Sequence, residues 1–245
     1  MRDEMYDQHY AVQKDHWWFV VKEKIVMDVI ERFCPRSSDR HILDAGCGPG
    51  LMLEGLKGLG HIYGMDFSDK AVQYSRGKKI GDIRQGDLPN HFPFTNLKFD
   101  LILALDLIEH IDEDVESLRV LRNALKPNGK LIITVPAFPF LWSKHDDMNQ
   151  HKRRYTRVEL TKKLELASLR IEQITYYNTF LFLPVLFIRA VQRIFKIESY
   201  SDLKVPSTRI NNALKFVFGL ERGLLKRGGR FPFGVSLMSV ASPEI

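Results

Sequence analysis

The sequence has few cysteines and no long apolar run. Of its 245 residues, only Cys34 and Cys47 are cysteines, too few for a disulfide framework or a four-cysteine zinc site. We therefore expect a reducing, cytoplasmic environment. The first residues have mixed charge and no apolar stretch, so no secretory signal is predicted. The longest apolar stretch, about residues 180–188, contains Pro184 and is too short to cross a bilayer.

The sequence also has no internal repeat and no low-complexity segment. Hydrophobic residues make up 44% of the chain and charged residues 27%, proportions that are typical of soluble globular proteins and exclude wholesale disorder. The length suits one large α/β domain, and residues 1–245 are interpreted as a single domain.

Short apolar runs alternate with amphipathic stretches between residues 41 and 136. The runs predict strands, and the stretches between them predict helices. This alternation is typical of a parallel sheet covered by helices. The predicted strands are 41–44, 62–66, 83–86, 99–104 and 130–136, and the predicted helices are 51–56, 69–78 and 112–125.

A glycine-rich loop follows the first predicted strand, in the sequence ILDAGCGPG at residues 42–50. Glycines let the backbone turn tightly and approach a ligand closely, and open α/β sheets bind ligands at this strand end. The nicotinamide fingerprint G-x-G-x-x-G is absent. Its last position, counted from Gly46 or Gly48, is Leu51 or Leu53. A nicotinamide dehydrogenase is therefore not favoured.

Acidic residues lie at or just after the ends of the first three predicted strands. Asp44 lies inside the loop, where it suits a ligand with an ammonium group. Asp66 ends the second strand, a position from which a carboxylate binds both ribose hydroxyls of a nucleoside. Asp87 follows the third strand and could accept a hydrogen bond from an adenine amino group, with Phe67 and Leu88 on either side of the ring. A turn-forming role is the alternative for Asp87.

Five ordered motifs carry a family resemblance: ILDAGCGPG, YGMDFS, GDLP, ALDLIEHI and LKPNGKLIITVPA. In order and spacing they resemble class I S-adenosylmethionine-dependent methyltransferases over about residues 40–136. The resemblance implies a Rossmann-like, doubly wound α/β fold with a seven-stranded, mostly parallel sheet. The last strand of that fold is antiparallel, and residues 234–240 are the candidate for it.

The resemblance also implies the cofactor S-adenosyl-L-methionine and a set of residues that hold it. The glycine loop would lie against the methionine part, the second strand end would hold the ribose and the third the adenine. The residues after the fourth strand would face the cofactor. By these matches the cofactor-binding residues are Asp44, Gly46, Cys47, Gly48, Asp66, Phe67, Asp87, Leu88, Asp106 and Leu107.

A polar and basic loop follows the fifth predicted strand and contains candidates for the acceptor side. If the acceptor is a hydroxyl, a base is useful, and His145, His151 and, from the fourth strand end, His110 are the candidates. The predicted substrate-binding residues are Arg153 and Arg154, which would hold an anionic group, and Tyr155. A solvated loop that caps the next helix is the alternative. No metal site is predicted.

An aromatic lead-in, Trp17–Phe19, precedes a predicted helix over about residues 20–33. With the pattern H-D-x-x-x-x-H-x-R-R-Y-T, it resembles a subgroup of these methyltransferases. The lead-in could close over the cofactor or pack in the core. The single domain is accordingly divided into an N-terminal lid or helix (1–39), a cofactor-binding core (40–136) and an acceptor-side half (137–245).

The net charge of +6 is confined to the end of the chain. Residues 187–245 contain ten basic and four acidic side chains, which account for the whole surplus. They overlap an amphipathic, aromatic-rich stretch at 180–196, within an apolar and basic elaboration at 180–230. Such a stretch is typical either of a core-facing helix or of a helix in a membrane interface. The position of the charge favours an anionic membrane surface over nucleic acid.

The sequence therefore predicts methyl transfer from S-adenosylmethionine to a small or lipid-linked acceptor, at oxygen, by a cytoplasmic protein that associates with a membrane surface. The overall plan is similar to that of ubiquinone-pathway O-methyltransferases. An RNA methyltransferase and a non-catalytic cofactor-binding protein of the same fold are the alternatives. The sequence contains no RNA-binding motif.

Overall fold

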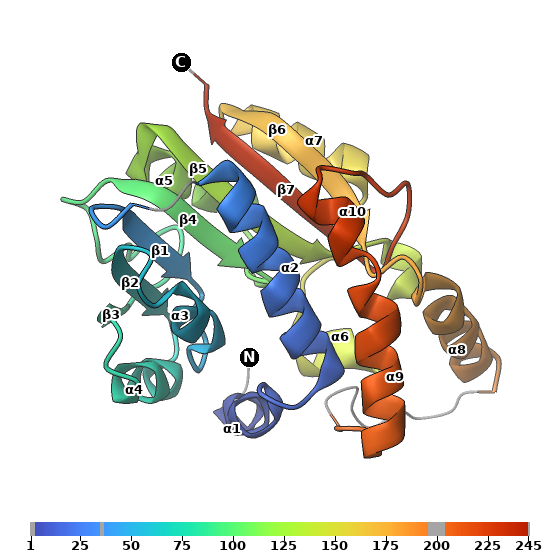
Figure 1. Cartoon of the computed structure of the whole chain (residues 1–245). Helices are drawn as coiled ribbons and strands as arrows, with labels where there is room; N and C mark the ends of the chain where they lie inside the picture. Colours follow the sequence, from blue (N-terminus) through green and yellow to red (C-terminus); the bar gives the residue numbers. More distant parts are fainter. Residues whose placement is uncertain (1–2, 35–36, 196–203, 245) are drawn as a thin grey trace.

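A seven-stranded sheet forms the centre of the computed structural model, which describes residues 3–34, 37–195 and 204–244 (Figure 1). The strand order is β3-β2-β1-β4-β5-β7-β6. Only β7 runs against its neighbours, while the other pairings are parallel. The strands are β1 (His41–Ala45), β2 (His61–Asp66), β3 (Asp82–Gln85), β4 (Phe99–Leu105), β5 (Leu125–Pro136), β6 (Leu169–Tyr177) and β7 (Ser236–Pro243).

Helices cover both faces of the sheet (Figure 1). One face packs against α2 (Trp17–Phe33), with α9 (Thr208–Gly219) and α10 (Arg222–Lys226) beside it. The other packs against α5 (Asp114–Ala124) and α7 (Arg157–Leu166). The remaining helices are α1 (Asp3–Val12), α3 (Leu51–Leu56), α4 (Asp69–Gly77), α6 (Lys144–Met148) and α8 (Phe182–Ile194), with 3₁₀ turns η1 (Ile108–His110) and η2 (Pro139–Leu141).

Burial of β4 explains its continuous apolar sequence. Leu101 and Leu103 pack on the α2 side of the sheet, whereas Phe99, Ile102 and Ala104 pack on the α5 side. A strand that is covered on both faces has no solvent side for polar residues. The parallel pairing of β4 with β1 then brings their carboxyl ends together, and this edge of the sheet is where the fold places ligands.

The predicted strands and helices of residues 41–136 are confirmed, with ends shifted by a few residues. The antiparallel last strand is also confirmed, at Ser236–Pro243 instead of 234–240. Two features differ. The lead-in Trp17–Phe19 is the first turn of α2, because His16 caps the helix by accepting a hydrogen bond from the Trp18 amide. Helix α1 was not predicted, and neither were α9 and α10. Part of the predicted elaboration, residues 196–203, lies outside the described residues.

Candidate functional site

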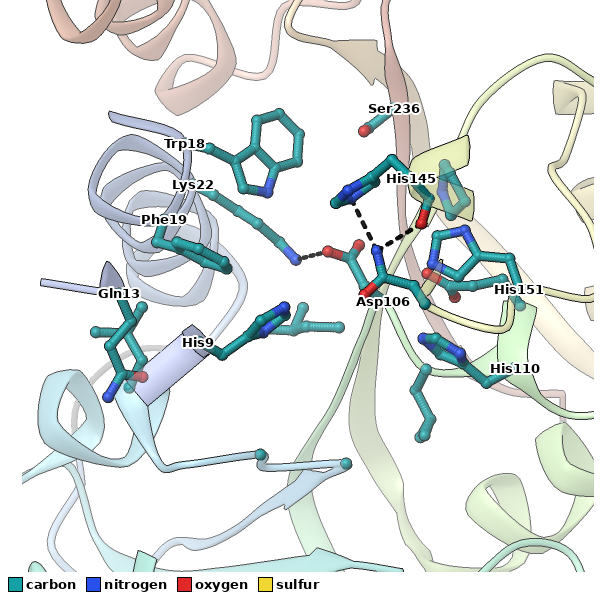
Figure 2. Close-up of a pocket in the computed structure, with 18 of the residues that line it drawn as sticks. His9, Gln13, Trp18, Phe19, Lys22, Asp106, His110, His145, His151 and Ser236 are labelled. Atoms are coloured by element: carbon teal, nitrogen blue, oxygen red, sulfur yellow. Dashed lines mark hydrogen bonds and ion pairs between the residues drawn. The ribbon is translucent and has the colours of Figure 1, made fainter. Parts of the chain in front are cut away.

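One pocket of about 850 Å³ lies at the carboxyl ends of the strands (Figure 2). Its volume is within the range of small-molecule sites. The loops after β1, β2 and β4 line one side, and α1 and α2 close over it. The loop after β5 and residues of α8 and α9 line the other side. The pocket therefore joins the predicted cofactor loops to the predicted acceptor loop.

The glycine loop has the backbone shape that the sequence predicts. Gly46, Gly48 and Gly50 all have positive φ angles, of 75°, 51° and 81°, which residues with a Cβ atom rarely adopt. A Cβ atom on Gly46 would also lie 2.8 Å from the Leu107 side chain. The loop and Leu107 therefore pack as closely as glycine allows, and both line the pocket.

Asp66 lies where a ribose-binding carboxylate is expected. It is buried and accepts hydrogen bonds from the amides of Gly48 (2.9 Å) and Ser68 (3.0 Å) and from the Tyr6 hydroxyl (3.2 Å). Burial raises the pKa of Asp66, although these hydrogen bonds oppose the shift. The two amides hold the carboxylate against the glycine loop, and Tyr6 links it to α1.

Asp44 is buried beside Asp66 with a strongly perturbed acidity. Burial and the neighbouring Asp66 charge raise the pKa of Asp44 to about 7, while Lys22 opposes the shift. An ammonium group bound in the pocket would favour the ionised carboxylate. The donor set of the loop thus fits S-adenosylmethionine, which carries an ammonium group and two ribose hydroxyls.

The adenine end of the predicted site is more open. Asp87, Leu88 and Phe67 all line the pocket. Leu88 is buried, whereas the Phe67 side chain is exposed. The Asp87 carboxylate lies 3.1 Å from the His91 ring, and its backbone also pairs with His91. Asp87 therefore takes part in a turn and also lines the pocket, so its position is compatible with both predicted roles.

Lys22 is a site residue that sequence reasoning missed. It extends from α2 into the pocket and pairs with the Asp106 carboxylate (Figure 2). Thr134 also donates its hydroxyl to Asp106 at 2.8 Å. Burial would raise the pKa of Asp106, but the Lys22 ammonium outweighs it and lowers that pKa. The available signal was a lysine among the apolar residues at the start of the helix.

Aromatic residues of the N-terminal helices both line the pocket and pack in the core. Trp17 and Trp18 line the pocket, and Trp18 also stacks on Phe218 with ring centroids 5.3 Å apart. Packing in the core is thus observed for the aromatic lead-in, whereas its closure over the cofactor stays a prediction. Within the part of the chain that the structure describes, one buried side-chain nitrogen each of His9 and Gln13 lacks a hydrogen-bond partner. Both residues line the pocket, where a bound polar group could pair with them.

Asp146 organises the predicted acceptor loop. This buried carboxylate accepts hydrogen bonds from the Ser143 amide (2.8 Å), from Nε and Nη2 of Arg154 (2.8 and 3.0 Å) and from Nδ1 of His151 (2.9 Å). Burial alone would raise the pKa of Asp146, but the bonds from His151 and Arg154 hold it well below its usual range. A proton on His151 Nδ1 leaves the lone pair on Nε2.

The other two predicted bases lie beside His151 (Figure 2). His145 Nε2 lies 2.9 Å from the Asn149 side-chain amide nitrogen, a donor, which indicates that Nε2 of His145 accepts this bond. The His110 ring lies 4.7 Å from the His151 ring, between centroids. Burial lowers the pKa of His110 to about 3, so this imidazole is neutral at ordinary pH.

The side chains of the predicted substrate-binding residues are bonded mainly to carboxylates of the protein itself. Arg153 pairs with Asp114 at 2.8 Å, and the buried Tyr155 donates its hydroxyl to Asp114, also at 2.8 Å. Neither lines the pocket. Arg154 does line it, but its guanidinium is bound to Asp146. These positions give no support to the predicted role of Arg153 and Tyr155, which stays untested.

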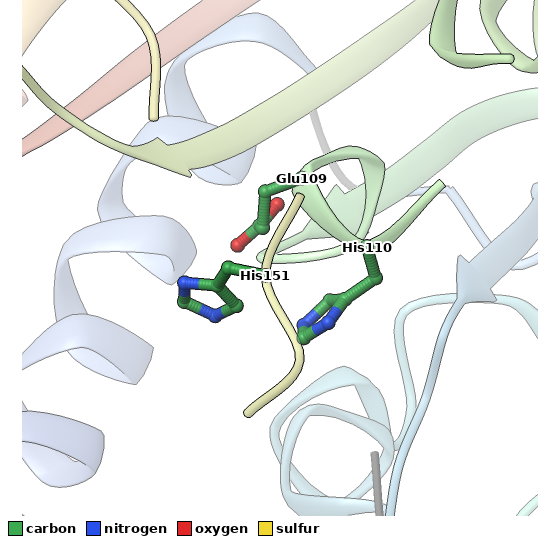
Figure 3. Close-up of side chains that lie close together, drawn as sticks. All are labelled: Glu109, His110 and His151. Carbon is green, nitrogen blue, oxygen red and sulfur yellow. The ribbon is translucent and has the colours of Figure 1, made fainter. Parts of the chain in front are cut away.

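Glu109, His110 and His151 form a compact cluster on the pocket wall (Figure 3). One potential ligand atom from each lies within 4.8 Å of the others. Glu109 is fully buried, and neither carboxylate oxygen has a hydrogen-bond partner among the described residues. Burial and the Asp106 charge raise the pKa of Glu109 well above its usual value. Glu109 lies in the ALDLIEHI motif, and the sequence assigned it no role.

Comparison with known proteins places this site in a family. Residues 43–133 match the family described as a methyltransferase domain. A probable S-adenosylmethionine-dependent methyltransferase of Mycolicibacterium smegmatis is 26% identical over 166 residues, 66% of this chain and 63% of the relative. A ubiquinone biosynthesis O-methyltransferase of Alkalilimnicola ehrlichii is 29% identical over 101 residues, 39% of this chain and 41% of the relative. The chain thus matches less than two thirds of either relative.

A solved structure agrees at the level of the fold. Phosphoethanolamine N-methyltransferase 2 of Haemonchus contortus, crystallised with S-adenosyl-L-methionine, is 15% identical with a TM-score of 0.57, over 89% of this chain and 51% of that one. The strand order, the glycine loop and the carboxylates at the strand ends are those that the family resemblance implies. Residues 43–133 of the chain thus match a methyltransferase domain, within the fold of the class I S-adenosylmethionine-dependent methyltransferases.

Proposed function

We propose that the protein transfers the methyl group of S-adenosylmethionine to an oxygen of an apolar, membrane-associated acceptor. One observation carries the proposal: a single pocket connects the Asp44–Asp66 cofactor loops to the His151 cluster and to α8. The cofactor supplies an activated methyl group on a sulfonium sulfur. The contribution of the chain is then to align the acceptor with it and to manage the acceptor proton.

The cofactor half of the pocket would bind through its carboxylates. Asp66 is preorganised by the Gly48 and Ser68 amides, so a ribose hydroxyl that displaced Tyr6 would find an oriented acceptor. Asp44 would pair with the ammonium group. The Lys22–Asp106 ion pair fixes the strand end next to Leu107 and so holds the wall against which the cofactor lies.

The proton of a hydroxyl acceptor would be removed at the histidine cluster. His151 has the most suitable geometry, because Asp146 orients its ring by a bond to Nδ1, and in the neutral imidazole with Nδ1 protonated Nε2 is the atom that accepts a proton. His110 is a weaker base, since burial lowers its pKa to about 3. His145 Nε2 already accepts a bond from Asn149. A hydroxyl acceptor needs a base more than an amine does. The presence of the histidine cluster therefore favours O-methylation.

The acceptor side of the pocket opens between apolar surfaces. Val185 and Ile188 of α8 and Leu214 of α9 line it. All residues of α8 are described, and Phe182 alone among them is buried. The exposed fractions of its largest apolar side chains are 66% for Leu183, 70% for Phe187, 51% for Ile188 and 73% for Ile194. Exposed apolar patches of this kind are typical of membrane or partner surfaces.

Basic side chains accompany this exposed surface. Arg189 and Arg193 lie on α8, and Lys204 and Arg189 line the pocket. An apolar helix with basic neighbours can lie in the interface of an anionic membrane, with its apolar residues among the acyl chains. None of the helices in the described part of the chain is long and apolar enough to cross a membrane. An acceptor dissolved in the membrane could thus enter the pocket beside α8.

The ubiquinone biosynthesis O-methyltransferase similarity supports oxygen as the acceptor atom, although only 39% of this chain takes part in it. The test is incubation of the full chain with methyl-labelled S-adenosylmethionine and, separately, with lipid, aqueous metabolite and RNA extracts of the source cells. We expect label in the lipid fraction. Label in RNA alone would favour the RNA methyltransferase alternative. If all fractions stay unlabelled while the cofactor binds, the protein is a non-catalytic binder.

A further inference from the structure

The side chains of Glu109, His110 and His151 converge from two segments on one point of the pocket wall (Figure 3). Glu109 and His110 belong to the 3₁₀ turn after β4, and His151 belongs to the loop after α6. Their potential ligand atoms lie within 4.8 Å of one another. In a tetrahedral site with bonds of about 2.1 Å, such atoms are about 3.4 Å apart. Shifts of less than about 1 Å for each side chain would close the cluster around an ion.

Several polar side-chain atoms of this cluster are buried without hydrogen-bond partners, which is unusual for polar residues that line a pocket. Both carboxylate oxygens of Glu109 and the Nδ1 atom of His110 are buried with no hydrogen-bond partner in the described ranges 3–34, 37–195 and 204–244. Leaving buried polar atoms unsatisfied is costly. A bound cation would satisfy the Glu109 oxygens and the His110 nitrogen together.

The third side chain has the support that metal-bound histidines usually have. His151 donates from Nδ1 to Asp146 at 2.9 Å, which leaves the Nε2 lone pair as the one that can bind an ion. Metal-binding histidines commonly donate their second ring nitrogen to a carboxylate. Asp146 is itself fixed by Arg154 and Ser143. Asp106 is not a fourth ligand here, because it is already paired with Lys22 and Thr134.

We propose that Glu109, His110 and His151 bind one divalent transition-metal ion of the zinc class, with a coordination position open to the pocket. Two imidazoles and one carboxylate favour such an ion over magnesium or calcium, which prefer oxygen ligands. Three protein ligands and one open position are typical of catalytic zinc sites.

The role of the ion rests on the proposed function. The acceptor oxygen would occupy the open position and lose its proton to water, because a divalent ion lowers the pKa of a bound hydroxyl. The resulting oxyanion forms the new bond to the methyl carbon, while the electrons of the carbon–sulfur bond return to sulfur and leave a neutral thioether. With the ion bound, His151 would be a ligand oriented by Asp146 and the ion would activate the acceptor hydroxyl, whereas in the metal-free protein His151 is the base of the proposed function.

The test measures binding of Zn²⁺ alone to the chelator-stripped full chain, by titration calorimetry and by elemental analysis after dialysis. We expect one ion per chain, and at least tenfold weaker binding in Glu109→Gln, in His110→Ala and in Asp146→Asn. His61→Ala, which changes a histidine far from the cluster, is the matched control and should bind like the wild type. Visible absorption of bound Co²⁺ reports coordination in the wild-type chain, so the test does not depend on the folding of variants.

Two kinds of result would contradict the metal site or the proposed function separately. Absence of stoichiometric Zn²⁺ binding to the wild type, or binding unchanged in Glu109→Gln and His110→Ala, would overturn the metal site. Because neither cofactor nor acceptor is present, this result leaves the proposed methyl transfer standing. Conversely, a chain that binds Zn²⁺ but transfers no methyl group to any extract would refute the proposed function and keep the metal site.

Discussion

The cofactor side and the acceptor side of the pocket differ in how their buried carboxylates are neutralised. On the cofactor side, no ion pair of Asp44 is found among the described residues, and the described hydrogen bonds to Asp66 come from neutral donors, so this side is prepared for a ligand. On the acceptor side, Asp146 and Arg154 neutralise each other, and the apolar residues of α8 are exposed to solvent instead. The cofactor loops thus suit a polar ligand, whereas we propose that the acceptor side receives an apolar one.

The largest effect is expected from breaking the charge pairing of the acceptor side. Asp146→Ala leaves the Arg154 guanidinium buried without its carboxylate. This should lower the free energy of unfolding by about 3–5 kcal/mol, as measured by urea denaturation. The control is Asp147→Ala, at the exposed neighbouring carboxylate, with an expected change of less than about 0.5 kcal/mol. Equal effects of the two variants would show that the Asp146–Arg154 pair does not organise this loop.

On the cofactor side, Asp66→Ala should weaken S-adenosylmethionine binding about 100-fold, because hydrogen bonds to a charged carboxylate contribute about 1.5–3 kcal/mol. Titration calorimetry measures the affinity. Asp69→Ala, an exposed carboxylate three residues away, serves as the control and should bind normally. Unchanged affinity in Asp66→Ala would refute the ribose assignment.

The exposed α8 surface can be tested independently of the cofactor. The double change Leu183→Ser and Phe187→Ser should weaken binding to anionic vesicles about 10–100-fold, since each side chain loses most of its apolar transfer free energy. Flotation measures the bound fraction. The control pair, Val158→Ser and Leu166→Ser, removes equally exposed apolar residues from α7. If the wild type does not float with any vesicle, α8 has no membrane role.

A smaller effect is expected from pH on the cofactor side. The raised pKa of Asp44, about 7, means that the folded protein binds a proton that the unfolded chain releases near pH 4. Stability of the cofactor-free protein should therefore fall as pH rises from about 4 to 7. If the cofactor ammonium needs the ionised carboxylate, affinity should rise about tenfold between pH 6 and 8. In Asp44→Asn, calorimetry should find both trends reduced.

The cofactor side could be predicted largely from the sequence because its residues follow buried strands. Asp44, Asp66 and Asp106 each lie at or just after the end of an apolar run, and parallel pairing brings such ends together. The loop geometry at Gly46 and Gly48 also follows from local sequence. The role of Lys22 on this side could not be predicted. Its partner Asp106 is 84 positions away, and helical periodicity gives no information on such contacts.

The acceptor side was less predictable because its contacts depend on packing. His145, His151 and His110 were expected near the pocket, and they line it. Arg153 and Tyr155 were expected there too, but both are bonded to Asp114 from α5, a partner that the motif does not reveal. Among the described residues the Glu109 carboxylate has no hydrogen-bond partner, because it belongs to a buried three-residue turn between β4 and α5, and the sequence alone does not show that burial.

We propose that cofactor and apolar acceptor meet in one pocket from its two sides. This can be measured as the rate of methyl transfer from labelled S-adenosylmethionine to the lipid extract, presented in anionic vesicles. We expect the Leu183→Ser and Phe187→Ser double variant to bind the cofactor normally but to lose most transfer, and Asp66→Ala to lose both. Transfer to lipid that is unchanged in the α8 variant, or label found only in water-soluble products, would refute this arrangement of the pocket.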